Sequence, residues 1–128
     1  MSSNATSLSA YEILNYRRRI VQEHLVELVI RRRQDIRTAK SLAETWAECV
    51  IEQAAVLAQS TQSSQEVAKG AFLQCAGTEN AMRVQLASLS DSPAAIVEER
   101  KRKALPIVLR FIEAMRGGRK PSKPEIIV

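Results

Sequence analysis

The sequence predicts an all-α protein, a small helical bundle of about four to five helices, from its composition, its capping signals and its periodicity. Among 128 residues there are only four Gly and four Pro, which leaves few turns for a sheet protein, and 45% of the residues are hydrophobic, as in a globular domain. Leu, Ala, Glu, Arg, Gln and Lys fill most positions, and these residues lose little rotamer freedom in a helix.

The first helix opens at Ser9-Ala-Tyr-Glu12, a capping box in which the hydroxyl and the carboxylate satisfy free amides of the first turn. Residues 1–8 are mostly Ser, Thr and Asn, so we expect a disordered arm before it. At 100° per residue the helix has one apolar stripe and should run to Arg33 or beyond. The stripe contains Leu14, Val21, Leu25, Leu28, Val29 and Ile36, and Ile13 and Ile20 widen it.

A second helix is predicted from the capping box Ser41-Leu-Ala-Glu44. Within it, Trp46 is expected to anchor the core with its indole N–H bonded at the rim. The opposite side carries a face of small and aliphatic residues, so we expect this helix to be packed from two directions. That face contains Ala47, Ile51, Ala54 and Ala58.

Two short helices and a long one should follow. Ser63-Ser-Gln-Glu66 is a third capping box, and the helix that it opens should end where Gly77 adopts a left-handed conformation. Thr78 is expected to cap the next helix, and Ser92-Pro93 should start the last one, which Gly117-Gly118 ends. A helix-turn-helix around Gly77 is disfavoured, because Arg83 lies where that motif needs an apolar residue.

The domain organisation predicted from these elements has three parts. Residues 1–8 form the arm, residues 9–118 form one bundle domain, and residues 119–128 form a flexible basic tail. The terminal Glu125-Ile-Ile-Val128 could add to a partner's sheet edge or dock on its own domain.

The last helix is apolar around nearly its whole circumference, and such a helix must be buried by something. One flank can serve the core and the other a second copy of the chain, so we predict a homodimer. The alternative is a central helix ringed by the others. The interface candidates are Ala47, Ile51, Ala54, Ala58, Leu105, Leu109 and Ile112.

The net charge of +5 is unevenly distributed, with basic ends and an acidic middle. The arginine triplets 17–19 and 31–33 lie about 40° apart on the first helix, and the run 100–103 is basic throughout. They could contact a partner or phosphates, or they could be solvated faces with i,i+4 neighbours such as Arg19 and Glu23. The contact candidates are Arg17, Arg18, Arg31, Arg32, Arg100, Lys101, Arg102 and Lys103.

No catalytic or metal-binding motif is present in the sequence. His24 is the only histidine, and Cys49 and Cys75 have the spacing of neither a zinc site nor a disulfide framework, so we interpret both as small buried hydrophobic residues. We therefore predict no enzyme activity, no cofactor and no metal. The sequence shows neither a signal peptide nor an apolar run of about 20 residues, which predicts a cytoplasmic location without membrane binding.

These features favour a non-enzymatic protein–protein interaction or regulatory module, of the adaptor, chaperone, inhibitor or effector type, that presents a helical face to a partner protein. The alternative is a nucleic-acid-binding protein that uses its basic helical faces for phosphate contacts.

Overall fold

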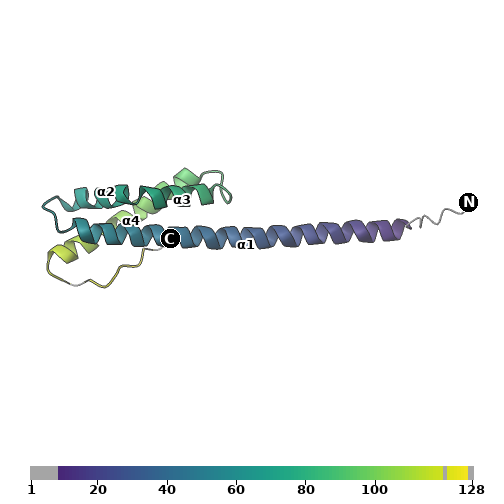
Figure 1. The fold of residues 1–128 in the computed structure, drawn as a ribbon, viewed down its shortest axis with the longest axis horizontal. Helices are drawn as coiled ribbons and strands as arrows, with labels where there is room; N and C mark the ends of the chain where they lie inside the picture. The colour runs from purple at the N-terminus through teal and green to yellow at the C-terminus, as the bar shows by residue number, and fades with distance from the viewer. Residues whose placement is uncertain (1–8, 120, 127–128) are drawn as a thin grey trace, which may run out of the picture. The chain divides into compact units, whose positions relative to one another are not determined.

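The computed structural model describes residues 9–119 and 121–126, and this part of the chain is all-helical, as predicted. Its four helices are α1 (Ala10–Leu57), α2 (Ser64–Gln74), α3 (Ala76–Leu86) and α4 (Pro93–Arg116) (Figure 1). The chain divides into two units, Met1–Gln34 and Asp35–Val128, so the boundary falls inside α1. The arm predicted for residues 1–8 lies outside the described residues.

Helix α1 continues through the segment where a second helix was predicted to begin, so the prediction of a new start at Ser41 was wrong. Residues 33–41 contain neither Gly nor Pro, and nothing interrupts the backbone ladder there. Thr45 Oγ1 donates to the Ser41 carbonyl at 3.0 Å, a bond that a threonine inside a helix makes to the carbonyl four residues before it. At Ser9 the hydroxyl cap does form, since the Glu12 amide donates to Ser9 Oγ at 3.2 Å.

The cap at Ser63 is also confirmed, because the Glu66 amide donates to Ser63 Oγ at 3.2 Å. Cys75 alone separates α2 from α3. Gly77 lies within α3 and has no positive φ, so the left-handed helix end predicted there was wrong. The chain turns at Cys75 instead, with φ −100° and ψ 19°, and Thr78 Oγ1 donates to the Cys75 carbonyl at 2.9 Å.

Helix α4 starts at Pro93 and ends at Arg116, before the two glycines that predicted its end. Gly118 has φ +76°, a conformation that glycine adopts without steric cost. The Gly118 amide donates to the Met115 carbonyl and the Arg119 amide to the Ala114 carbonyl, each at 3.2 Å. This pair of bonds is the Schellman arrangement, which satisfies carbonyls that the helix end leaves free.

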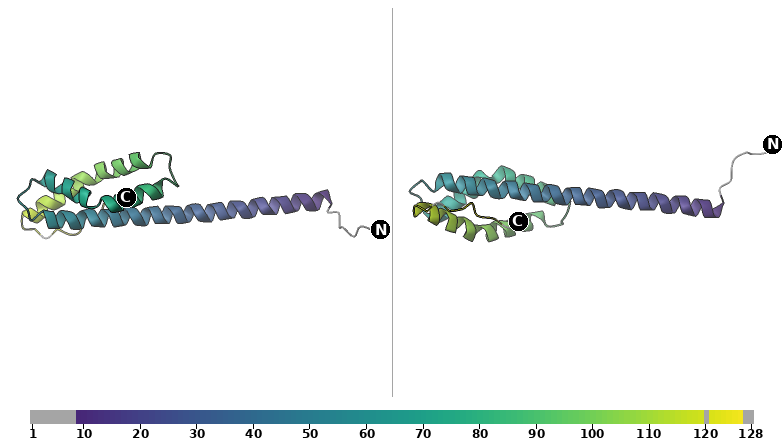
Figure 2. Two further views of the ribbon diagram at one scale, coloured as in Figure 1. Left: turned by 45° about the horizontal axis from the view of Figure 1, so that its top comes forward. Right: turned by 90° about the horizontal axis from the view of Figure 1, so that it is seen from below.

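The core of the second unit lies between the C-terminal part of α1 and the helices α2, α3 and α4, which Figure 1 and Figure 2 show side by side. Trp46 is fully buried, and its ring stacks on Phe72 with centroids 6.0 Å apart. The expected rim bond of its indole was wrong, because Nε1 is buried with no hydrogen-bond partner among the described residues. Around Trp46, the largest fully buried side chains are Met82, Ile112, Val50, Val67, Val97 and Val108.

A disulfide joins Cys49 in α1 to Cys75 between α2 and α3, with the Cα atoms 6.0 Å apart. The interpretation of these residues as unpaired hydrophobic side chains was therefore wrong. Cys75 is buried as expected, at 1% exposed, whereas Cys49 is only half-buried and packs against the core. The pairing depends on α2 folding back along α1, which the spacing of 26 residues does not reveal.

After α4 the chain returns to α1 and packs on it (Figure 2). Ile126 is 9% exposed and belongs to the core, so this end of the described chain docks on its own domain. Lys123 Nζ lies 3.8 Å from Glu48 Oε1 on α1. Ile126 shares a small cavity with Ala47 and Ile51, and this tail therefore covers part of the small-residue face.

Candidate interaction surface

The residues predicted to form a dimer interface lie mostly in the interior of the chain's own fold. On the small-residue face, Ile51 is 5% exposed and Ala54 is fully buried. Leu105 and Leu109 on α4 are half-buried and pack against the core. The remaining three candidates are buried as well: Ala47 is 8% exposed, Ala58 7% and Ile112 0%.

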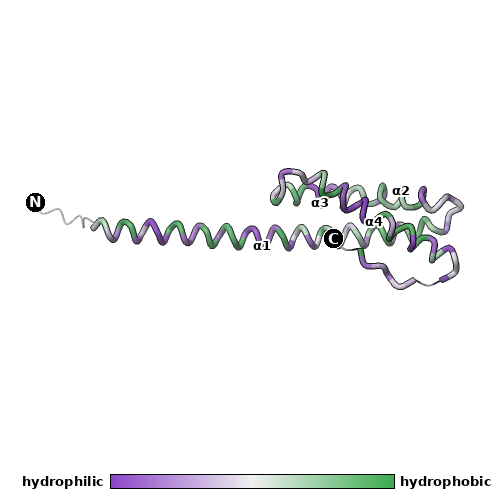
Figure 3. The backbone as a smooth tube through the Cα atoms, turned by 180° about the vertical axis from the view of Figure 1, so that it is seen from behind, coloured by the Kyte–Doolittle hydropathy of each residue, from purple (hydrophilic) through white to green (hydrophobic). Residues whose placement is uncertain are grey.

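The largest set of exposed apolar side chains lies in the first unit. Its described residues contain one helical segment, residues 10–34 of α1, with no second element to pack on it. Polar and apolar residues alternate along it in Figure 3. Five aliphatic residues on one face define what we call the N-terminal stripe: Leu14 (57% exposed), Val21 (56%), Leu25 (54%), Leu28 (43%) and Val29 (50%).

The N-terminal stripe is continuous, because helical periodicity places its members within an arc of about 100°. From Leu14 to Val29 it extends along about 22 Å of helix. Soluble proteins seldom leave such a set uncovered unless it binds something. The sequence predicted an apolar stripe here, and among the described residues only the second unit supplies helices that bury an apolar face.

Four of the arginine candidates lie on or beside this stripe. Arg18 and Arg32 fall within about 40° of its axis, Arg17 lies about 60° from the axis, and Arg31 lies farther round on the same side, about 100° from it. All four side chains are exposed, and none forms an ion pair or hydrogen bond with another described residue. The neighbour pair Arg19 and Glu23 forms no ion pair among these residues either.

The carboxylates of this segment lie on the other side of the helix. Glu12, Glu23 and Glu27 are each at least about 140° from the axis of the N-terminal stripe. All three are exposed. The N-terminal stripe is therefore flanked by positive charge, and the carboxylates of this segment lie on the other side of the helix.

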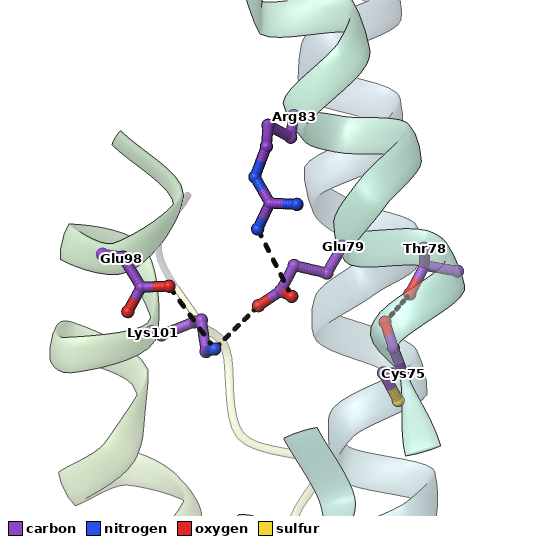
Figure 4. A network of polar contacts seen from close by, with 6 residues as sticks. All are labelled: Cys75, Thr78, Glu79, Arg83, Glu98 and Lys101. Carbon is purple, nitrogen blue, oxygen red and sulfur yellow. Dashed lines mark hydrogen bonds and ion pairs between the residues drawn. The ribbon is translucent and has the colours of Figure 1, made fainter. Parts of the chain in front are cut away.

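Lys101, a candidate from the second basic run, is held in a local network (Figure 4). Its Nζ lies 2.9 Å from Glu79 Oε1 and 3.6 Å from Glu98 Oε1, and Arg83 also reaches Glu79 at 3.6 Å. The Glu79 carboxylate beside its ammonium group raises the pKa of Lys101, against the opposing effect of burial. The charge of Lys101 is therefore already neutralised by Glu79 on α3 and by Glu98 on its own helix α4.

The other three candidates of the run are also engaged. Arg102 Nε donates to Glu99 Oε2 at 2.9 Å, and Lys103 Nζ lies 3.8 Å from the same carboxylate. The bond from Arg102 lowers the pKa of Glu99 and raises that of Arg102. Arg100 Nη1 donates to the Met82 sulfur at 3.3 Å, and burial lowers its pKa. The eight predicted contact residues thus separate into four free and four engaged cations.

An open groove of about 990 Å³ lies beside this network, between α2, the start of α3 and α4. Its wall includes Phe72, whose ring centroid is 6.0 Å from Lys101 Nζ, and Leu73, which is 69% exposed. Three of its carboxylates, Glu79, Glu98 and Glu99, already pair with cations. The groove has mixed charge and offers no nucleophile beside a base.

The described residues hold no group of three or more His, Cys, Asp or Glu side chains that could bind a metal ion. None of their helices has the length and apolar character needed to cross a membrane.

Comparisons with known proteins return no match: no protein-family model, no curated protein and no solved structure matches this chain.

Proposed function

We propose that this protein is a non-enzymatic interaction module that binds a partner protein through the N-terminal stripe, while residues 35–126 form its folded body. The exposure of the stripe carries the proposal: its five aliphatic side chains are between 43% and 57% exposed. Covering the exposed half of such a side chain stabilises a complex by about 1 kcal/mol. Adaptor, chaperone, inhibitor and effector roles all fit this mode of binding.

The homodimer predicted from the sequence bears on the same surface. Most of the earlier interface candidates lie in the interior, whereas the N-terminal stripe is exposed to a second copy as well as to a partner. A second copy is therefore an alternative occupant of the stripe.

The test compares two changes on opposite faces of one helix. The double variant Val21→Glu with Leu25→Glu places charges on the stripe, whereas Tyr16→Glu, at a residue 60% exposed, places one on the far face. Affinity capture from the native source, with nuclease treatment and quantitative mass spectrometry, should recover a protein partner with the wild type and with Tyr16→Glu. The stripe variant should lose it by at least about tenfold.

Equal recovery by all three chains would overturn the proposal. Circular dichroism serves as the control, because both variants should remain as helical as the wild type.

Nucleic-acid binding is the second candidate function, and the exposed triplets 17–19 and 31–33 favour it. Free arginines on one helix can contact phosphates without reading sequence. The test is fluorescence anisotropy with mixed-sequence duplex DNA and RNA at low salt. Binding that weakens with salt, and that Arg18→Glu with Arg32→Glu removes, would support it; undetectable binding at low salt would eliminate it.

The disulfide concerns the cellular compartment in which the protein works. Disulfides persist in oxidising compartments and are rare in the cytosol. We propose that the protein works where the bond between Cys49 and Cys75 is kept, in place of the cytoplasmic location predicted from sequence. Trapping thiols in the native source and measuring the two cysteines by mass spectrometry should find them paired. Free thiols would favour the cytoplasm.

A further inference from the structure

The charges around the N-terminal stripe restrict what can cover it. Any occupant must bury aliphatic side chains and, at the same time, lie against Arg18 and Arg32 near the axis of the stripe. Burying a guanidinium without a counter-charge costs far more than its stem gains from packing. The occupant must therefore be apolar along its centre and acidic beside it.

A second copy of the chain does not meet this requirement. A parallel pair in register would place Arg18 against Arg18 and Arg32 against Arg32. Other alignments still join two faces that carry arginines and no carboxylate, because Glu23 and Glu27 lie on the far side. Like charges facing each other disfavour this complex.

Phosphates and lipids each meet only one of the two requirements, an apolar centre and acidic groups beside it. A nucleic-acid backbone would neutralise the arginines but would leave Leu25 and Leu28 uncovered, because the phosphate surface is polar. A helix that lies on an anionic membrane carries its cations at the edges of the apolar face. Here Arg18 and Arg32 lie close to the axis, and the acyl layer would have to accept them.

A partner helix meets both conditions. Its apolar seam can pack on the aliphatic residues, and acidic side chains along the seam can accept paired hydrogen bonds from the guanidinium groups. We propose that the N-terminal stripe binds an amphipathic helix of a partner protein whose apolar seam is flanked by Asp and Glu. This inference rests on the proposed function and adds the chemistry of the partner.

Two synthetic helical peptides provide the first test. Both have about 25 residues with Leu at the seam, and they differ only in carrying Glu or Lys at the flanking positions. Fluorescence anisotropy with the full-length chain should show the Glu peptide binding at least about tenfold more tightly, with a gap that narrows as salt is added. Equal affinities, or no binding of the Glu peptide, would overturn the inference.

Charge reversal on the chain provides the matched test. Arg18→Glu with Arg32→Glu changes the two arginines near the axis, and Arg19→Glu with Arg33→Glu moves the same charge change about 100° around the helix. The first variant should prefer the Lys peptide, and the second should keep the preference for the Glu peptide. A reversal in both variants, or in neither, would show that the position of the arginines on the stripe does not select the partner.

The other occupants are outcomes of the same experiment. Tighter binding of duplex RNA or of anionic vesicles than of the Glu peptide would contradict the inference. So would a wild-type dimer in sedimentation equilibrium that Val21→Glu dissociates. If the stripe variant loses the native partner but the peptides bind equally, only this inference fails; if that variant keeps the partner, the proposed function fails.

Discussion

The two ends of α1 belong to one continuous helix but have opposite surroundings. Its N-terminal part exposes large aliphatic side chains, of which Leu25 is 54% exposed, whereas its C-terminal part buries small ones such as Ala43 and Ala54 completely. Small residues let other helices approach closely, and large ones on an uncovered face remain available to a partner. Periodicity alone therefore shows that a helix has an apolar face, while the rest of the chain decides what covers it.

The largest expected effect on stability follows a change at Trp46. Truncation to Ala removes a fully buried ring that stacks on Phe72, and it should lower the free energy of unfolding by about 3–5 kcal/mol. Urea denaturation followed by circular dichroism measures it. Leu14→Ala, on the N-terminal stripe, is the control and should change stability by less than about 0.5 kcal/mol. Similar losses in both variants would break the contrast between the two parts of the helix.

The disulfide should have the next largest effect. It closes a loop of 26 residues, and on the chain-entropy model replacing Cys49 and Cys75 with Ser lowers the free energy of unfolding by about 3–4 kcal/mol. Reductant should lower the free energy of unfolding of the wild type by a similar amount and should not change that of the double variant. A wild type whose stability does not respond to reductant would show that the bond does not constrain the second unit.

A smaller effect is expected where the tail packs on α1. Ile126→Ala removes part of a side chain that is 9% exposed, and the expected loss in unfolding free energy is about 2 kcal/mol, near the low end for such truncations. Glu125→Ala, at an exposed neighbour, serves as the control and should change little. If the two variants are equally stable, the tail contributes nothing to the core.

The smallest effect concerns Lys101 and depends on pH. Its pKa is raised in the folded chain, so its contribution to stability is complete below the unfolded pKa of about 10.4 and is lost as pH rises through the folded value. Lys101→Met should therefore be less stable than the wild type by less than about 1 kcal/mol at neutral pH. The difference should shrink in denaturation curves above about pH 10.5. A difference that grows with pH would contradict the assignment to Glu79 and Glu98.

Local signals in the sequence predicted much of this fold. The caps at Ser9 and Ser63 and the stop at Gly117 act within a few residues, and each is found as expected. The predicted helix start at Ser41 was wrong because a capping-box sequence can also occur inside a helix that no residue interrupts.

Features that depend on distant contacts were not predictable in this way. The pairing of Cys49 with Cys75 and the burial of the small-residue face need the tertiary arrangement. The arginines were identified as candidates, but only the structure separates free Arg18 and Arg32 from Lys101, which Glu79 and Glu98 already neutralise.

Hydrogen–deuterium exchange along α1 tests the central claim most directly, because it compares both parts of one helix in one experiment. In the free chain, amides of residues 14–29 should exchange orders of magnitude faster than those of residues 43–54, since the described part of the first unit has no second element to pack on the first group. Addition of the Glu peptide should slow exchange in residues 14–29 and leave residues 43–54 unchanged. Equal protection of both segments in the free monomer, or protection by the peptide only elsewhere, would contradict the account.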